Sequence, residues 1–488
     1  MLPLSLHKRT RTKAIALVTE SGQAITYRTL LRALSVPLRL LEFHDKALVA
    51  VFVDRNLDSI LAYLASLSLG HACGFFGSLP QDAQEWLTEV YQPEFIVHPP
   101  GIEERLSPSL GAYKPVGSLP RGGVVWRRSA PGDEIIGADL ALLLATSGST
   151  GSPLLVRLSR ANLEANASAI VAALGITSAD RAITSLPLSH CYGLSVLNSH
   201  LAAGASVVVT PERVLSARFW RTVARNDVTS FSGVPVIYET LYGRRFDLTG
   251  YPSLTRLTQA GGPLAHDLVR YFAELMERRD GQFWVMYGQT EATARITCLP
   301  PREWKRRPGA VGRVVPGGQL WVEDPAGTVL PDGERGAVFY SGPSVMLGYA
   351  RFRADLAKGD VTGGKLATGD IGYLRDGYLY LTGRAKRIVK ILGFRVELDQ
   401  IEAAFRAAGP AAAVKGAGET IVVFTERRLS EHDGILAWLL RQLSLPPGLL
   451  TLRQIGEIPV TRSGKADYQA LAARALEVWP DHAGTQRD

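Results

Sequence analysis

Residues 144–163 read LATSGSTGSPLLVRLSRANL, an apolar run that enters a polar loop and resumes as an expected helix. Gly148 and Gly151 allow backbone angles that other residues avoid, so successive amides can turn inward as an anion-binding nest. Hydroxyl donors flank these glycines at Thr146, Ser147, Ser149 and Thr150. Ordinary turns have the same composition, but the loop also predicts a phosphate site that binds through uncharged donors.

The composition is that of a soluble globular protein with more than one domain. The 488 residues exceed what one hydrophobic core usually holds, and 46% are hydrophobic while 20% are charged. Three cysteines lie far apart without a CxxC pair, which argues against a disulfide framework or a zinc site. The net charge of +8 is spread along the chain without a long basic block. This balance suits acidic ligands and argues against a nucleic-acid-binding face.

Neither a secretory signal nor a membrane span is expected. The basic residues of MLPLSLHKRTRTK follow a very short apolar start, the reverse of a secretory signal, so a cytoplasmic protein is predicted. Two uncharged stretches, within Ser59–Gln81 and Ala182–Pro211, contain histidine, glycine and proline. Because a membrane helix needs a continuous apolar run, both are interpreted as buried strand-turn-helix segments.

Alternating strands and helices predict a layered α/β fold. Lys46–Val53 is expected to be a buried strand and Asn56–Leu69 a helix that ends at Gly70. The alternation returns at Arg181–Leu186, Leu194–Ala203, Ser206–Thr210, Ala217–Asn226 and Val228–Phe231. This order predicts a largely parallel sheet covered by helices. From Gly309, short β-rich runs alternate with glycine-containing turns, which predicts a small β-barrel or meander over about 309–383.

Four more motifs follow the loop in order. They are MYGQTEAT (286–293), LATGD (366–370), LTGRAKRIVKILGFRVEL (381–398) and IPVTRSGKADYQAL (458–471). Together with the loop they resemble the adenylate-forming superfamily, which contains acyl-CoA synthetases, peptide-synthetase adenylation domains and firefly luciferase. The resemblance runs from Ile25 to Leu471. It implies a large N-terminal AMP-binding domain over 1–384, of layered α/β sheets with a small β-barrel, and a small mobile α+β C-terminal lid domain over 385–488.

The segment after residue 286 combines an aromatic ring, a bare backbone position, a hydroxyl and a carboxylate. Such a cluster can stack a base and place a hard oxygen on a magnesium ion that phosphates already hold, or it can be a strand end with a surface glutamate. The resemblance places these residues in the ATP site: Tyr287, Gly288, Gln289, Thr290 and Glu291. It assigns Tyr287 to adenine, Thr290 to phosphate and Glu291 to Mg2+.

Other nucleotide contacts are implied by the resemblance. Asp370 matches the aspartate that accepts hydrogen bonds from both ribose hydroxyls, and Arg384 matches the ribose-binding arginine. Gly261, Gly262 and Pro263 match the small-residue turn that flanks the nucleotide, although alone they would indicate only a turn.

The C-terminal lid of the resembling family carries a hinge, a catalytic lysine and a thiol channel. The hinge falls at Lys386, where a solvated lysine in a charged turn is the alternative interpretation. Lys465 matches the lysine that bridges the substrate carboxylate and the α-phosphate as pyrophosphate leaves. Its ammonium would stabilise the charge that builds in the transition state. Gly393 and Phe394 match the loop that approaches the thiol channel after the lid rotates.

The segment LPLSHCYGLSVL, residues 186–197, concerns the acid substrate. His190 lies where acyl- and aryl-CoA synthetases often carry a histidine against the acyl pocket, and a purely structural role is equally open. The other expected members of this pocket are Cys191, Tyr192 and Gly288. Amino-acid-activating relatives carry an aspartate in this region, but none stands between Arg181 and Glu212. A buried α-ammonium would lack its counter-charge, so a fatty or aryl acid without an α-amino group is favoured.

One departure from the family pattern concerns the phosphate loop. Where the family continues as PKGV, this chain has PLLV over 153–156, so the lysine is replaced by Leu154. Arg157 or Arg160 could supply the missing charge if either reaches the phosphates. Without such a replacement, the loss favours a non-catalytic nucleotide-binding or regulatory relative. The matches that argue against this second class are Glu291, Asp370, Arg384 and Lys465.

The predicted activity is that of an ATP- and Mg2+-dependent, AMP-forming ligase. A small carboxylic acid would become an acyl-adenylate, and the acyl group would then pass to a thiol. The acceptor is predicted to be CoA or the phosphopantetheine of an acidic acyl-carrier protein, and the basic balance of the chain fits both. An amine acceptor, which would give an amide, stays open as an alternative.

Overall fold

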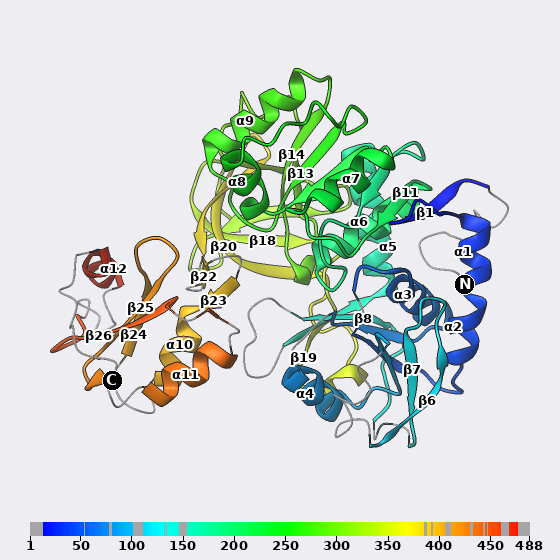
Figure 1. Cartoon of the computed structure of the whole chain (residues 1–488). Coiled ribbons are helices and arrows are strands. Elements are labelled where there is room, and N and C mark those ends of the chain that lie inside the picture. Colours follow the sequence, from blue (N-terminus) through cyan, green and yellow to red (C-terminus); the bar gives the residue numbers. More distant parts are fainter. Residues whose placement is uncertain are drawn as a thin grey trace, which may run out of the picture. The chain divides into compact units, whose positions relative to one another are not determined.

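The computed structural model describes residues 13–52, 54–77, 81–100, 111–130, 132, 134–145, 154–384, 388–391, 394–405, 411–429, 433–442, 445–446, 448–459 and 468–476. The chain divides into two compact units (Figure 1). The first comprises Met1–Thr146 and Leu154–Gly383, and the second contains Arg384–Asp488.

The largest sheet of the first unit is mixed and has 13 strands among the described residues. Its strand order is β17-β18-β20-β21-β16-β15-β14-β13-β12-β10-β11-β1-β2. The strands are β1 (Ile15–Thr19), β2 (Ala24–Thr26), β10 (Arg181–Ile183), β11 (Ser206–Val209), β12 (Ser230–Gly233), β13 (Arg256–Gln259), β14 (Gln282–Tyr287), β15 (Thr297–Leu299), β16 (Ala310–Val314), β17 (Gln319–Glu323), β18 (Gly336–Ser341), β20 (Lys365–Arg375) and β21 (Tyr378–Arg384). The stretch from β14 through β13, β12, β10 and β11 to β1 is parallel, as the alternation of strands and helices predicts.

A second sheet of the first unit has eight described strands in the order β19-β9-β8-β4-β3-β5-β7-β6. The strands are β3 (Leu48–Val51), β4 (Ala72–Phe75), β5 (Phe95–His98), β6 (Tyr113–Ser118), β7 (Val124–Arg128), β8 (Leu140–Ala145), β9 (Leu155–Ser159) and β19 (Gly348–Ala350). Its centre, β8-β4-β3-β5, is parallel.

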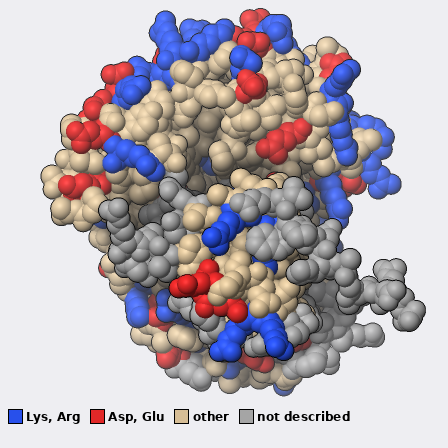
Figure 2. Space-filling model, turned by 90° about the vertical axis from the view of Figure 1, so that its left-hand side faces the viewer, with Lys and Arg blue, Asp and Glu red and all other residues tan. Residues whose placement is uncertain are grey.

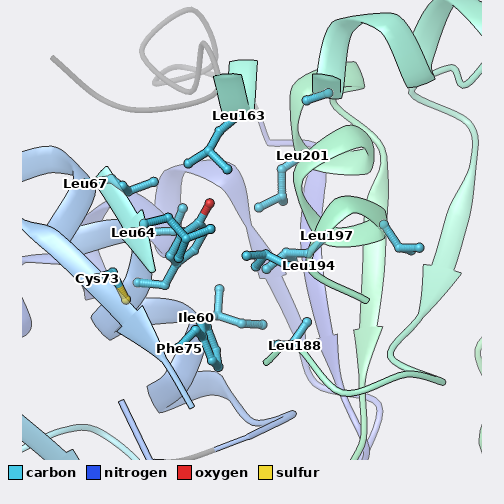
Figure 3. Packing of buried hydrophobic residues seen from close by; sticks show 14 of the residues in the cluster. Ile60, Leu64, Leu67, Cys73, Phe75, Leu163, Leu188, Leu194, Leu197 and Leu201 are labelled. Carbon is cyan, nitrogen blue, oxygen red and sulfur yellow. The ribbon is translucent and has the colours of Figure 1, made fainter. Parts of the chain in front are cut away.

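The helices of the first unit pack against both of its sheets. They are α1 (Tyr27–Ala33), α2 (Ser35–Leu40), α3 (Leu57–Leu69), α4 (Gln81–Tyr91), α5 (Arg160–Leu174), α6 (Cys191–Ala203), α7 (Ala217–Arg225), α8 (Pro235–Gly243) and α9 (His266–Glu277). Helices α7, α8 and α9 cover one face of the larger sheet (Figure 1), and their aromatic side chains pack against β12, β13 and β14. On the other face, one buried cluster joins α3, α5 and α6 with strands of both sheets. In Figure 3, leucines of α6 such as Leu194 and Leu197 face Ile60 and Leu64 of α3.

Helix α3 begins and ends where the sequence predicts, because capping residues mark both of its ends. The Asn56 side chain accepts a hydrogen bond from the Ser59 amide at 2.9 Å, and the Ser59 hydroxyl accepts from the Asn56 amide. Gly70 ends the helix at φ +79°, a left-handed conformation that glycine adopts without steric cost. The expected strand over 46–53 is also confirmed, as β3.

The β-rich part after Gly309, which was expected to be a small β-barrel or a meander, is a group of antiparallel strands. Its strands run in the open order β17-β18-β20-β21-β16, and this group continues through β15 into the larger sheet. Among the described residues no pairing joins β17 to β16 and closes a ring. The region therefore extends the large sheet by antiparallel strands, which carries β20 toward the end of β14.

The second unit is a small α+β fold. Its strands are β22 (Ile388–Ile391), β23 (Phe394–Glu397), β24 (Ala411–Lys415), β25 (Ile421–Thr425) and β26 (Leu450–Gln454), and its helices are α10 (Leu398–Phe405), α11 (Asp433–Gln442) and α12 (Tyr468–Leu476). Alternate residues of β25 point to opposite faces, so Val423 packs with α10 and α11 while Phe424 packs with α12.

Helix lengths and surface charge concern two expectations from the sequence: that the chain has no membrane span and that it has no nucleic-acid-binding face. Over the described residues no helix is both long and apolar enough to cross a bilayer. On the face that Figure 2 shows, lysine and arginine side chains are interspersed with aspartate and glutamate.

Candidate functional site

The carboxyl ends of the parallel strands β10, β13 and β14 form the edge on which the candidate site is built. Ligands of open α/β sheets bind outside such ends. The loop 184–190 follows β10, the turn 260–263 follows β13, and the segment 288–291 follows β14. A hydrogen bond of 3.4 Å from Thr290 Oγ1 to Cys191 Sγ shows that the first and last of these segments meet.

The segment after β14 is held in a strained conformation. Thr293 and Ala294 both have positive φ, at +61° and +143°, and Thr293 Oγ1 donates to the Ser344 carbonyl at 2.6 Å. A Cβ on Gly288 would lie 1.8 Å from the Ala294 carbonyl oxygen. Glycine at 288 is therefore required by the turn of the chain itself.

Thr290 and Glu291 lie on a short 3-10 helix, Thr290–Ala292, and both side chains are half-buried. Glu291 Oε1 accepts a hydrogen bond from the Tyr349 hydroxyl at 2.9 Å. No group of three or more histidine, cysteine, aspartate or glutamate side chains able to hold a metal exists in the described part of the chain. A single carboxylate fits Mg2+ that is bound mainly by phosphates and water.

Tyr287 and Asp370 form the buried pair of the predicted adenine and ribose subsites. The Tyr287 hydroxyl donates to Asp370 Oδ2 at 2.5 Å, so β20 and the end of β14 are joined at this point. Gln289 Nε2 donates to the Thr368 carbonyl at 3.3 Å, which links the same two segments a second time. Gly369, at φ +73°, turns the chain between Thr368 and Asp370.

The turn 260–263 lies at the same sheet edge. Gly261 has φ +87°, and the Gln259 side chain donates to the Gly262 carbonyl at 2.7 Å. The turn, which Pro263 completes, leads into α9. Its left-handed glycine agrees with the sequence-based expectation of a tight turn.

His190 stands at the N-cap of α6, where its side chain is exposed. Desolvation by the surrounding protein lowers the pKa of the imidazole, and the Asp54 carboxylate opposes that shift. Asp54 Oδ1 also accepts from the Leu188 amide at 2.8 Å, so it orients the loop that carries His190. Sequence reasoning missed Asp54, because nothing local to it points to a loop more than a hundred residues away.

Cys191 and Tyr192 begin α6 next to a buried cation that sequence reasoning also missed. Burial raises the pKa of the Cys191 thiol. The Tyr192 hydroxyl is hydrogen-bonded to Thr258 Oγ1 at 2.8 Å. The guanidinium carbon of Arg295 lies 4.3 Å from the centre of the Tyr192 ring. The available signal was one arginine in the otherwise uncharged run 292–301.

Arg157 does not supply the charge that Leu154 lacks. Its side chain is fully buried on β9, and it donates to backbone carbonyls of Leu347, Tyr349, Lys358 and Gly359. Of the two arginines that could supply this charge, Arg157 is therefore not available, because these carbonyls occupy its guanidinium. Arg160, the other candidate, pairs with Glu164 at 3.0 Å on the surface of α5.

Several predicted site residues lie outside the described residues or are described only as backbone. Outside are Thr146, Ser147, Gly148, Ser149, Thr150, Gly151, Lys386, Gly393 and Lys465. Arg384 ends β21 and Phe394 begins β23, and their side chains are not described. Their roles stay predictions.

Comparison with known proteins gives several CoA ligases as relatives. Sulfoacetate-CoA ligase of Cupriavidus necator is 34% identical over 350 residues, which cover 69% of this chain and 67% of that protein. The 4-coumarate-CoA ligase-like 6 protein of Arabidopsis thaliana is 30% identical over 347 residues, 67% of this chain and 61% of the relative. Oxalate-CoA ligase of Arabidopsis thaliana is 32% identical over 271 residues, 54% of this chain and 52% of the relative. The matches thus span about half to two thirds of these relatives.

Solved structures share the fold over nearly the whole chain. A double mutant of o-succinylbenzoate CoA synthetase (MenE) from Bacillus subtilis has a TM-score of 0.76 at 21% identity, covering 98% of this chain and 99% of that one. The amide bond synthetase McbA from Marinactinospora thermotolerans has a TM-score of 0.77 at 23% identity, covering 98% and 100%. The family model described as AMP-binding enzyme matches residues 6–350. The chain therefore belongs to the AMP-binding enzymes, the adenylate-forming superfamily that its ordered motifs resemble.

Proposed function

We propose that the protein is an AMP-forming acid-thiol ligase that uses ATP and Mg2+. A carboxylate oxygen of the substrate attacks the α-phosphorus of ATP, and pyrophosphate leaves. A thiol then attacks the carbonyl carbon of the acyl-adenylate, so that AMP leaves and the thiol proton is released. The observation that carries this proposal is the Tyr287–Asp370 pair beside Thr290 and Glu291 at the carboxyl edge of the parallel strands.

Each described residue has a part in this scheme. Tyr287 would cover adenine, Asp370 would accept the ribose hydroxyls, and Glu291 would bind Mg2+ that the phosphates hold. Thr290 would donate to the α-phosphate. The loop 146–151, Arg384 and Lys465 complete the site in this proposal, with Lys465 stabilising the charge of the transition state. The Lys386 hinge and the Gly393–Phe394 thiol channel belong to the second step.

The acid is proposed to lie between the start of α6 and the segment after β14. His190, Cys191 and Tyr192 would line it from one side. Oxalate and sulfoacetate, the acids named for two of the relatives, have no α-amino group. CoA is the favoured acceptor because these relatives are CoA ligases. Two other acceptors are to be compared with CoA: the phosphopantetheine of a carrier protein, and an amine, which an amide synthetase would use.

Exchange of labelled pyrophosphate into ATP, measured over a panel of carboxylic acids, tests the first step. Mass spectrometry of the products with CoA, with phosphopantetheinylated carrier protein and with amines tests the second. Acid-dependent exchange followed by a CoA thioester is the expected result. ATP binding without exchange for any acid would instead identify a non-catalytic nucleotide-binding protein.

A further inference from the structure

Arg295 is a buried cation whose contacts are unlike those of an ordinary structural arginine. Only 2% of its surface is exposed. Its Nε donates to Met286 Sδ at 3.2 Å, and its guanidinium lies over the Tyr192 ring. Within the part of the chain that the structure describes, no oxygen atom accepts a hydrogen bond from this guanidinium. Burial of a cation is costly unless an anion or several acceptors compensate it.

Two other buried arginines of the same unit show what compensation looks like. Arg353, 7% exposed, forms a 2.6 Å ion pair with Glu94 and donates to the carbonyls of Tyr91, Gln92 and Glu134. Arg157, with no exposed surface, donates to four backbone carbonyls. The fold thus provides oxygen acceptors where an arginine serves only the scaffold, and it leaves Arg295 a sulfur atom and an aromatic face.

Two hydrogen bonds hold the backbone around Arg295, and the residues before it are strained. Asn166 Nδ2 donates to the Arg295 carbonyl at 3.1 Å, and the Ile296 amide donates to the Tyr287 carbonyl at 2.9 Å. The two residues before Arg295 adopt positive φ. Strain of this kind persists where the surrounding structure imposes it, and it is common at ligand-binding sites.

A series of side-chain contacts connects Thr290 with Arg295. Thr290 Oγ1 contacts Cys191 Sγ at 3.4 Å, Tyr192 follows on the first turn of α6, and the Tyr192 ring contacts Arg295. Beyond it lies the Cys298 thiol, whose pKa burial raises to about 11 while the positive charge of Arg295 opposes that rise. Arg295 is thus linked to Thr290 through the start of α6, where the acid is proposed to lie.

We propose that Arg295 determines the specificity of the acid pocket, and that the preferred substrate carries a second anionic group, a carboxylate or a sulfonate, at the end remote from the activated carboxylate. This inference rests on the proposed function. The second anion would accept charge-assisted hydrogen bonds from the guanidinium and supply the acceptors that the protein does not. A site built to bind such a group rejects an analogue that lacks it, because the buried cation is then left uncompensated.

The test compares matched pairs of acids that differ only in the second group: linear alkanoates, α,ω-dicarboxylates and ω-sulfoalkanoates of equal chain length. The kcat/KM of acid-dependent pyrophosphate release is measured for the wild type, Arg295→Met and Arg295→Lys. In the wild type we expect a preference for the dianion of about a hundredfold or more. Arg295→Met should abolish or reverse this preference, and Arg295→Lys, which keeps the charge without the planar fork, should retain part of it.

Arg270→Met is the matched control, because it removes an equal charge from an exposed side chain of α9 that is paired only with Asp267 in the described structure. Its preference among acids should equal that of the wild type. A thermal shift by the dianion alone, seen in the wild type and absent in Arg295→Met, measures binding without turnover. If the methionine variant folds poorly, the acid preference of Arg295→Lys tests the same role.

The outcomes separate the two proposals. Exchange with some acid but equal kcat/KM for each matched pair, or a preference that survives in Arg295→Met, overturns the role of Arg295 and leaves the ligase activity standing. A lower Tm in Arg295→Met with unchanged acid preference shows a purely structural arginine and also overturns it. Absence of exchange with every acid refutes the proposed function, whereas a dianion-dependent thermal shift that needs Arg295 would still support the anion site.

Discussion

Arg157 allows a quantitative test of whether the phosphate loop has a substitute for its missing lysine. In Arg157→Met four backbone carbonyls lose their donor, among them Leu347 at 3.0 Å and Tyr349 at 3.2 Å. A hydrogen bond to a charged group contributes about 1.5–3 kcal/mol, and such contributions are not additive. Leaving one buried acceptor without its donor costs about 1–3 kcal/mol, so the loss of donors to four carbonyls should cost about 3–5 kcal/mol in total.

The expected shift in Tm follows from the size of the first unit. At about 2.1 cal/mol/K per residue, a unit of this size has an unfolding entropy of about 0.8 kcal/mol/K, so the Tm should fall by roughly 4–6 °C. Scanning calorimetry measures this shift. The KM for ATP in pyrophosphate exchange, measured well below the Tm, should stay within about twofold, because the guanidinium points at carbonyls and not at phosphate.

Arg160→Met is the control for this measurement. Its exposed i,i+4 pair with Glu164 contributes about 0.3–0.5 kcal/mol, so the Tm should fall by less than about 1 °C. An unchanged Tm in Arg157→Met together with a tenfold higher KM for ATP would refute the structural role assigned to Arg157. A higher KM in Arg160→Met that Leu154→Lys partly reverses would identify Arg160 as the substitute.

Three further predictions concern the nucleotide site, the lid and acid stability. Tyr287→Phe removes the hydroxyl that holds Asp370 at 2.5 Å, so the KM for ATP should rise about tenfold, equivalent to about 1.4 kcal/mol, while equal rises for ATP and acid would contradict this role. Lys465→Ala should slow adenylation about a hundredfold or more and spare thioester formation from a supplied acyl-adenylate; equal losses in both half-reactions would argue against a lysine that acts only in the first. Burial lowers the pKa of His98 and of His200 to about 4, so the unfolded chain, with its ordinary pKa near 6.5, takes up protons first as the pH falls. The free energy of unfolding should therefore be full above about pH 6.5 and decrease toward pH 4, and a flat urea-unfolding profile over that range would contradict the assignment.

Elements that are specified by adjacent residues were predictable from the sequence. The capping pair Asn56 and Ser59 and the terminal Gly70 fix α3 locally. The order of strands and helices predicts the parallel sheet, and the sheet then places the segments after β10, β13 and β14 at one edge. Whether the strands after Gly309 close into a barrel was not predictable from the sequence, because alternating strands with tight turns have the same pattern in an open sheet and in a ring.

Gly288 is required for a reason that the sequence does not show. The sequence shows a residue without a side chain between two ligand candidates, which is compatible with close approach of a ligand. The space is taken by the Ala294 carbonyl, which arrives there through two positive-φ residues. Backbone that folds back over six residues leaves no signature in the residues themselves, so only the structure can assign the contact.

Arg157, which the sequence offered as one source of phosphate-binding charge, and Arg295, which sequence reasoning missed, differ in how far the sequence could have located them. Arg157 interrupts the run LLVRL, and both neighbouring strands, β8 and β19, pair with β9 at this residue, which encloses its side chain in the sheet. A charged side chain on a buried strand is stable only if nearby groups, such as backbone carbonyls, accept its hydrogen bonds. The position of Arg157 in an apolar run therefore favoured a structural role. Arg295 precedes the short strand β15 and has no such acceptors among the described residues. Its burial results from α6 packing over it, and the same burial that makes an uncompensated guanidinium costly for the scaffold makes it selective for an anionic ligand.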